Sequence, residues 1–322
     1  MSIVRTVTGD VVPEELGTTA SHEHLWCDRR ICRPPSRFPS IQYPLVLQDP
    51  DLILQELSTF RASGGQTIVD ATVAGWGRDV GRLRALSLLS GVRVIATSGF
   101  YIERCHPRGT EDATVEALTD RLVCEITEGA DGTPIRTGLL KAAISRPCIA
   151  GMERKAAVAV AQAHKRTGAA ITTHSPGAYR FELAGGNAGT AFLDLFEAQG
   201  VDPSRVIIGH VDSNPDIRQL VALARRGAII EFDFVGREER LLDETRVELL
   251  CRLVDRGFEN QLLLSSDVCR ERDLGVRGGR GYSHVLDRFV PRLRDAGFDD
   301  RLLGQLLGRN PARVFAINEN NT

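Results

Sequence analysis

The sequence lacks the long apolar runs that a membrane-spanning helix needs. Hydrophobic residues make up 42% of the 322 positions and charged residues 25%, but no run reaches the roughly 20 apolar residues of such a helix. The first five residues contain no apolar core of a signal peptide. These features predict a soluble globular protein with a sizeable core, located in the cytoplasm.

An excess of charge is also missing. The formal net charge is −2 and the isoelectric point is near 6.4, which argues against a nucleic-acid or membrane-surface partner. The seven cysteines include no Cys-x-x-Cys pair and their number is odd, so we expect reduced thiols rather than a disulfide framework. Cys27 and Cys32 could bind a metal, but without a second pair we favour plain loop thiols.

A dinucleotide-binding Gly-x-Gly-x-x-Gly does not follow the first expected strand. Instead, apolar runs rich in β-branched residues alternate with amphipathic helical segments such as 50–62 and 153–167. Counting the stretch at 18–25, the expected strands number eight, the others being 67–72, 92–100, 138–145, 170–174, 206–211, 228–233 and 261–267. Glycines that suit left-handed helix C-caps precede many of them: Gly64, Gly65, Gly91, Gly168, Gly200, Gly227 and Gly257.

Apolar strands that alternate with helices indicate a parallel sheet covered by helices, and eight units favour a closed (β/α)8 TIM barrel over an open Rossmann sheet. We expect one domain that spans residues 1–322. Residues 3–15 should form a short β-hairpin across the bottom of the barrel. The active site is expected at the C-terminal ends of the strands, with the long loop at 26–47 shaping its mouth.

The stretch around His22 and His24 is the strongest chemical signal. Strand side chains alternate between faces, so these two imidazoles point the same way at the end of a strand. Neutral imidazole is the commonest protein ligand for zinc and similar metals. The alternative is two polar residues on an exposed strand face.

Other ionisable residues recur at later strand ends, namely Lys141, His174, His210 and Asp267. Four of the seven histidines thereby fall on one barrel face, which predicts a metal centre. His174 or His210 alone would be better explained as a core histidine with its hydrogen bonds satisfied. Asp267 could ligate a metal and accept a proton from metal-bound water, or it could cap a following helix.

Lys141 lies within an apolar strand, where a bare ammonium is costly and would repel metal cations. A neutral amine there could take up CO2 to give a carbamate (N6-carboxylated Lys141), whose two oxygens could bridge two metals. The alternative is a structural lysine that reaches the barrel mouth or pairs with an acid. Two divalent ions would activate a bridging hydroxide at neutral pH, which implies hydrolysis without an organic cofactor.

In this order the motifs resemble the phosphotriesterase family of the amidohydrolase superfamily. The motifs that carry the resemblance are Gly-x-x-x-x-His-Glu-His (17–24), Gly-Leu-Leu-Lys (138–141), Thr173-His174, Ile-Gly-His (208–210), Ser266-Asp267 and the closing Asn-Pro-Ala-Arg-Val-Phe (310–315). The resemblance implies that His22, His24 and Asp267 bind the more buried metal and that His174 and His210 bind the more exposed one. Carboxylated Lys141 would bridge them. It also implies a possible homodimer.

Further stretches at 99–101, 232–236, 278–282 and 289–294 look most like the branch called phosphotriesterase homology proteins. After Asp233, lactonases of this family usually carry arginine and phosphotriesterases histidine, whereas this chain has Phe234. Tyr101, Trp26 and Phe234 are candidate pocket residues, although packing at the rim would also explain the first two. Asp70 and Asp233 could orient histidine ligands or cap loops.

The loop after the last strand is basic, with Arg270, Arg272, Arg277 and Arg280. Arginine suits carboxylate and phosphate groups, so Arg270 and Arg280 are candidate contacts to an anionic substrate; the alternative is a solvated loop balanced by Glu271 and Asp273. We expect a small-molecule hydrolase with two metals, zinc first and manganese, iron or cobalt as alternatives. A carboxylic ester or lactone is the preferred substrate. Amidase action on a small N-acyl compound, phosphotriester hydrolysis and a non-catalytic ligand-binding barrel are the alternatives.

Overall fold

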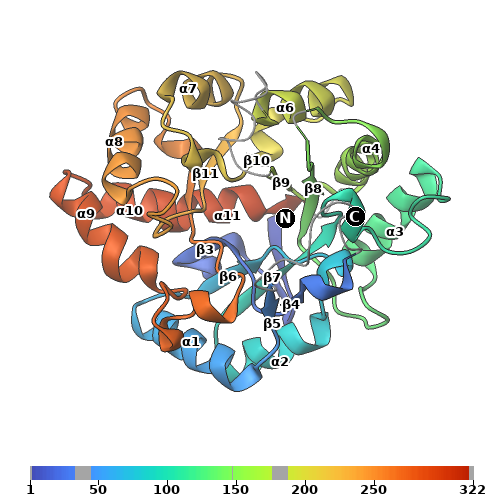
Figure 1. Cartoon of the computed structure of the whole chain (residues 1–322), viewed down its shortest axis with the longest axis horizontal. Coiled ribbons are helices and arrows are strands. Elements are labelled where there is room, and N and C mark those ends of the chain that lie inside the picture. The colour runs from blue at the N-terminus through green and yellow to red at the C-terminus, as the bar shows by residue number, and fades with distance from the viewer. Residues whose placement is uncertain (1, 33–44, 147, 176–187, 319–322) are drawn as a thin grey trace.

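A barrel of eight parallel strands, surrounded by helices, forms the centre of the molecule (Figure 1). The computed structural model describes residues 2–32, 45–146, 148–175 and 188–318. In order around the barrel the strands are β3 (Thr19–Glu23), β6 (Thr67–Asp70), β7 (Arg93–Gly99), β8 (Leu139–Ala143), β9 (Ile171–His174), β10 (Val206–Ile208), β11 (Ile229–Phe232) and β12 (Leu262–Leu264). The predicted eight-stranded barrel is confirmed.

The barrel closes where β12 meets β3, through contacts just beyond the end of β12. The amide of Asp267 donates to the carbonyl of His22, and the amide of His24 donates to the carbonyl of Val268, both at 3.1 Å. Between the two histidines, the Glu23 carboxylate accepts hydrogen bonds from Ser265 Oγ at 2.8 Å and from the amide of Val268 at 2.7 Å. These bonds fix the loop that carries Asp267 to the strand that carries both histidines.

The helices form the outer layer and are, in order, α1 (Pro50–Ala62), α2 (Val80–Ser90), α3 (Val115–Thr127), α4 (Gly151–Thr167), α6 (Ala188–Ala198), α7 (Ile217–Arg225), α8 (Asp243–Val254), α9 (Val290–Asp295), α10 (Asp300–Gly304) and α11 (Asn310–Phe315). Local sequence explains their ends. Asp49 caps α1 through the amides of Asp51 and Leu52, and Gly91 and Gly168 end α2 and α4 in the left-handed conformation, as predicted.

The bottom of the barrel is covered by both ends of the chain. β1 (Ser2–Thr6) pairs with β2 (Gly9–Val11) in the predicted hairpin, and β13 (Ile317–Asn318) pairs with the other edge of β1. Val4 and Phe315 pack in one buried cluster with inward residues of the barrel strands, such as Ile207. This apolar plug leaves the opposite end of the barrel for chemistry.

At that opposite end a disulfide joins two loops, which corrects the prediction that all cysteines are reduced. Cys32 lies in the sequence after β4 (Cys27–Asp28), a strand that pairs with β5 (Val46–Leu47), and Cys105 lies after β7. The two cysteines form a disulfide across 73 residues of sequence. Their spacing gave no hint, because only the barrel brings these loops together. Cys27 is a buried free thiol, as expected. No described helix is long and apolar enough to cross a membrane.

Candidate active site

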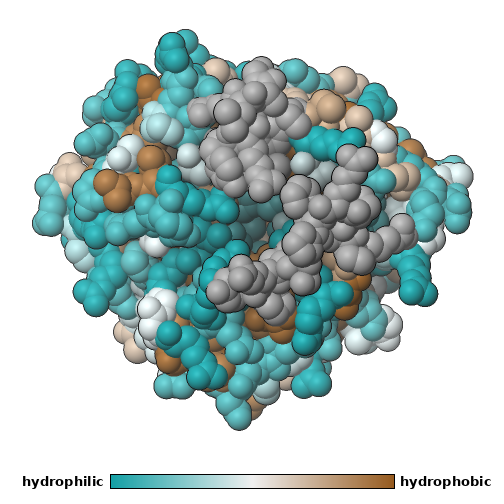
Figure 2. All heavy atoms as spheres, in the orientation of Figure 1, coloured by the Kyte–Doolittle hydropathy of each residue, from teal (hydrophilic) through white to brown (hydrophobic). Residues whose placement is uncertain are grey.

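The predicted site residues meet at the C-terminal ends of the strands. Figure 2 shows a hollow near the centre of the face that Figure 1 presents, bordered by hydrophilic residues. His22, His24, Lys141 and His210 are each at most 2% exposed. Asp267, at 7%, is the most exposed of the buried members. Residues from five different strands or their following loops thus share one enclosed space.

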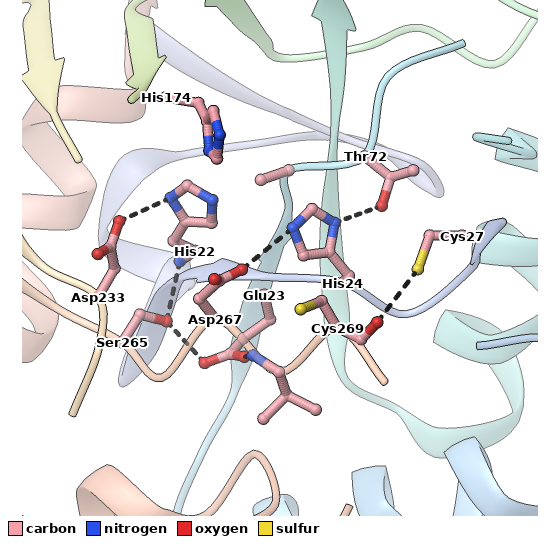
Figure 3. Close-up of polar contacts among 12 residues, drawn as sticks. His22, Glu23, His24, Cys27, Thr72, His174, Asp233, Ser265, Asp267 and Cys269 are labelled. Carbon is pink, nitrogen blue, oxygen red and sulfur yellow. Dashed lines mark hydrogen bonds and ion pairs between the residues drawn. The ribbon is translucent and has the colours of Figure 1, made fainter. Parts of the chain in front are cut away.

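The two histidines of β3 lie side by side, with ring centroids 5.8 Å apart. Each is oriented through one ring nitrogen (Figure 3). Nδ1 of His22 lies 3.0 Å from Glu231 Oε2 and 3.2 Å from Asp233 Oδ2, and Nδ1 of His24 lies 2.7 Å from Thr72 Oγ1. Because these contacts hold the outer nitrogens, Nε2 of His22 is left without a partner among the described residues, and Nε2 of His24 faces Asp267.

Asp233 also orients His210. Its Oδ1 lies 3.0 Å from His210 Nδ1, and its carboxylate accepts the His210 amide. The glycine before this histidine is required, because a Cβ on Gly209 would come 2.9 Å from Asp233 Oδ2. The free nitrogen of His210, Nε2, faces Nδ1 of His174 at 2.6 Å. The expectation that Asp233 orients histidine ligands is therefore supported by its contacts.

Asp267 stands in the loop after β12 with Oδ1 3.3 Å from His24 Nε2. Its other oxygen, Oδ2, accepts from Arg237 Nη2 at 2.9 Å. Among the described residues only three other than glycine have positive φ, and two are His210 at 62° and Asp267 at 48°. Such backbone strain is concentrated at functional sites. Asp267 caps no helix, so that alternative is wrong.

The donor set fits a metal centre. The ligand atoms of His22, His24 and Asp267 all lie within 4.8 Å of one another. Nε2 of His22 is buried and has no hydrogen-bond partner among the residues that the structure describes, which is a costly state unless a ligand binds it. Imidazoles held by a carboxylate or hydroxyl on the second nitrogen are typical of metal sites. His22, His210 and Asp233 form a second such group, but Asp233 already serves both histidines as their outer partner.

Lys141 projects from β8 between these groups. Its Nζ donates to the carbonyl of Ala71 at 2.9 Å and lies 5.9 and 5.8 Å from the ring centroids of Trp76 and Tyr101. No described carboxylate forms an ion pair with it, so the alternative of an acid-paired lysine is not observed. Burial lowers the pKa of Lys141, which favours the neutral amine that carbamate formation requires.

Burial lowers the pKa values of the histidines, and nearby carboxylates raise them. Burial lowers the pKa of His24 to about 3, and burial together with His210 holds that of His174 well below its ordinary value. Burial and Lys141 oppose protonation of His22 too, but Glu231 and Asp233 raise its pKa to about 10. Three neutral imidazoles, including that of His210 with its lowered pKa, are in the form that binds metals.

Aromatic rings form one wall of the site. Trp76 lies 4.4 Å from the His24 ring and stacks on Tyr101 at 4.8 Å, and Tyr101 lies 4.5 Å from the His174 ring. Phe234 stacks on His210 at 4.5 Å. Tyr101 and Phe234 therefore lie against the histidines of the site, and their contact with a substrate stays a prediction.

Two predicted substrate contacts need correction. Trp26 packs in a buried cluster, with the Arg82 guanidinium of α2 over its ring at 4.8 Å, so Trp76 occupies the position expected for it. Arg280 donates to the carbonyls of Ser266 and Asp267 at 3.0 Å and thus braces the loop.

Arg270 is half-buried, and its Nε has no partner among the described residues. Asp70 accepts from the amides of Leu25 and Thr72 and caps loops.

Sequence reasoning missed three residues. Glu23 stands between the two histidines of the motif and carries no role in the sequence analysis, although its carboxylate joins β3 to the loop after β12. Trp76 ends the 3-10 turn Ala74–Trp76 after β6, six residues beyond Asp70, and no sequence pattern marks it. Arg237, 4% exposed, contacts both Asp267 and Cys269. Only its position shortly after Asp233 could have drawn attention to it.

The fold and the site together define a TIM-barrel protein with a cluster of histidines and carboxylates at its mouth that could hold metal ions. A model of the Phosphotriesterase family matches residues 2–315. The chain therefore belongs to the phosphotriesterase family, whose model spans nearly its whole length.

Individual relatives extend this result. The chain is 33% identical to an N-acetyltaurine hydrolase from Rattus norvegicus, with 96% of each chain covered. It is 31% identical to a phosphotriesterase homology protein from Escherichia coli, covering 93% of this chain and 98% of that protein. The structure of a lactonase from Listeria monocytogenes matches with a TM-score of 0.85 at 28% identity, over 97% of this chain and 98% of the other.

Proposed function

We propose that this protein is a hydrolase with two metal ions that cleaves the amide bond of a small N-acyl compound. The observation that carries the proposal is the convergence of four imidazoles, Lys141 and Asp267 on one end of the barrel, with Nε2 of His22 buried and unpartnered among the described residues. The choice of an amide is supported by the 33% identity to a relative that hydrolyses N-acetyltaurine. Amide hydrolysis, an alternative at the level of sequence, thereby becomes the first candidate.

His22, His24 and Asp267 would hold one ion and His174 and His210 the other. Lys141 would contribute to both as a carbamate, formed when its neutral Nζ adds to CO2 and loses a proton. Bound ions of this kind lower the pKa of water to about 7 and polarise a carbonyl oxygen. A histidine and carboxylate donor set favours zinc and also accommodates manganese, iron or cobalt.

The protein supplies orientation and proton transfer. Arg237 outweighs the effect of burial and keeps the pKa of Asp267 well below its ordinary value, so this carboxylate is ionised and can accept a proton at Oδ1. Passing that proton to the nitrogen of the leaving amine would complete hydrolysis of an amide, whose leaving group is poor unless protonated. Burial raises the pKa of Tyr101 to about 12, so its hydroxyl stays protonated and can donate to a substrate oxygen.

A lactone is the second candidate. It is favoured by the match to the Listeria lactonase at a TM-score of 0.85. Against it, the position after Asp233 holds the apolar ring of Phe234, stacked on His210, where lactone-hydrolysing members usually have arginine.

The test is to load the purified protein with zinc, manganese or cobalt, count metals per chain, and assay N-acetyl amino acids, N-acetyltaurine, lactones, esters and phosphotriesters. We expect two ions per chain and amine release as the fastest reaction. Lys141→Met should lower the metal content and reduce turnover by at least about 100-fold, whereas Lys165→Met, on the exposed side of α4, should change neither. Two bound ions with no turnover of any substrate would overturn the proposal and support the ligand-binding barrel.

A further inference from the structure

Two arginines stand on the loops that the disulfide joins. Arg29 begins the short 3-10 turn Arg29–Ile31, directly before Cys32, and Arg104 lies in the 3-10 turn Glu103–Cys105, directly before Cys105. The Cys32–Cys105 bond ties these turns together across the mouth. The disulfide therefore keeps the two turns that carry the positively charged Arg29 and Arg104 next to each other.

Neither arginine is paired with a carboxylate in the part of the chain that the structure describes. Nε of Arg29 is buried without a hydrogen-bond partner, and no described carboxylate forms an ion pair with Arg29 or Arg104. Burial and the charge of Arg29 both lower the pKa of Arg104. Neighbouring arginines differ: Arg30 pairs with Asp28 at 2.8 Å and Arg237 with Asp267 at 2.9 Å.

The pair adjoins the catalytic side chains. The Arg29 guanidinium lies 5.8 Å from the ring centroid of Tyr101, and the charges of Arg29 and Arg104 both act on the pKa of the Tyr101 hydroxyl. The same ring lies 4.5 Å from the His174 ring. The Tyr101 ring therefore separates the Arg29 guanidinium from the imidazole of His174.

We propose that Arg29 and Arg104 form a subsite, held together by the Cys32–Cys105 disulfide, that binds the anionic group of the substrate at the end away from the scissile amide. This inference rests on the proposed function and adds to it the substrate class, a small N-acyl sulfonate or carboxylate. Two half-buried guanidiniums suit such a group, because charge-assisted hydrogen bonds to oxyanions are strong where water is scarce. The anion also relieves the repulsion between the two cations.

The disulfide contributes by limiting how far the two turns can separate. Reduction by a dithiol breaks the S–S bond, gives two thiols and oxidises the dithiol to its own disulfide, so two electrons and two protons are transferred. Without the bond, repulsion between Arg29 and Arg104 is free to move the turns apart. Weaker binding of the anionic group follows, with little effect on a neutral ligand.

The experiment uses two ketones that cannot be hydrolysed, the anionic 4-oxopentane-1-sulfonate and its neutral methyl sulfone counterpart 5-(methylsulfonyl)pentan-2-one, which have similar size and differ in the charge of the terminal sulfur group. Calorimetric titration of the metal-loaded protein measures both affinities. We expect the sulfonate to bind at least about tenfold more tightly, and Arg29→Gln or Arg104→Gln each to weaken the sulfonate about tenfold while sparing the neutral ketone. Arg108→Gln, an exposed arginine four residues after Arg104, is the matched control and should change neither affinity.

The disulfide is tested by Cys32→Ser, Cys105→Ser and reduced wild type, with circular dichroism to verify folding. We expect a severalfold loss of sulfonate affinity in all three. The proposal is overturned if the sulfonate does not bind, if both arginine variants keep the wild-type preference, or if both ketones lose affinity equally. Because neither ketone reacts, these outcomes are separate from a failure of the protein to hydrolyse amides.

Discussion

Two buried aspartates illustrate how residues of the same type at equivalent strand ends take different roles. Asp233 contacts the outer nitrogens of His22 and His210, and its contacts with His210 and His22 outweigh burial and hold the pKa of that carboxyl well below its usual range. Asp70 contacts no described histidine directly; it accepts from backbone amides and from the Thr72 side chain, and burial raises its pKa to about 6. The partner therefore decides between orienting a ligand and capping a loop.

Asp233→Asn should lower metal affinity by about 10–100-fold, because the amide cannot accept from both imidazoles while it also accepts the His210 amide. Asp70→Asn is the matched control and should reduce stability with little change in metal affinity. Competition with a fluorescent zinc chelator measures both variants. Equal metal affinity in the two variants would contradict the assigned roles.

Sequence alone predicted the residues whose signal is local. His22 and His24 share a face by strand periodicity, and Lys141, His174, His210 and Asp267 each end an apolar run. Trp76, Arg237 and the closing role of Glu23 depend on contacts between segments far apart in the chain, as does the Cys32–Cys105 disulfide. No periodicity encodes such contacts, and Trp26 was chosen over Trp76 for this reason.

Among elements, the junction of β3 and β12 depends on one side chain. Glu23 is fully buried and accepts from Ser265 Oγ and from the amides of Ser266 and Val268. Glu23→Leu leaves these donors unsatisfied and should lower the free energy of unfolding by several kcal/mol, at about 1–3 kcal/mol per donor. Urea denaturation measures this loss. Ser265→Ala removes one of these bonds and the bond that the His22 amide donates to Ser265 Oγ, and it leaves both other bonds to Glu23 in place, so it should cost less; a loss as large as that of Glu23→Leu would argue against Glu23 as the main closing contact.

A second junction, between α3 and β7, should respond to pH. Arg78 lies 2.8 Å from Glu125 Oε2 and donates to the carbonyl of Thr97 at 2.9 Å. Although burial raises it, the pKa of Glu125 is held below its ordinary value of 4.5 by Arg78. A lowered native pKa gives stability that is present above the unfolded pKa and is lost as the pH falls through the native one.

We therefore expect the free energy of unfolding of the wild type to fall more steeply below pH about 4.5 than that of Glu125→Gln. Urea melts at a series of pH values from 6 downward measure the two slopes. Other carboxylates titrate in both proteins, so the difference between slopes isolates Glu125. Parallel curves would show that Arg78 does not stabilise the ionised carboxylate.

At the scale of the whole molecule, the barrel should fold without metal but be more stable with it. The buried apolar clusters lie outside the donor set, so chelation should leave the far-ultraviolet circular dichroism unchanged. Ligands that bind only the native state add RT ln(1 + [L]/Kd), about 2.7 kcal/mol when free metal is 100 times Kd. Melting curves before chelation, after it and after zinc is restored should show a reversible decrease in Tm. An unchanged Tm would argue against metal binding at this site.

Ser2 and Asn318 pair across adjacent strands beneath the apolar plug, with Ser2 Oγ donating to Asn318 Oδ1 at 2.8 Å. A label or a solid support attached at Ser2 or Asn318 would consequently lie beneath the barrel, and substrates would still reach the mouth. A short cross-link between these two positions would likewise join β1 to β13 without touching the site.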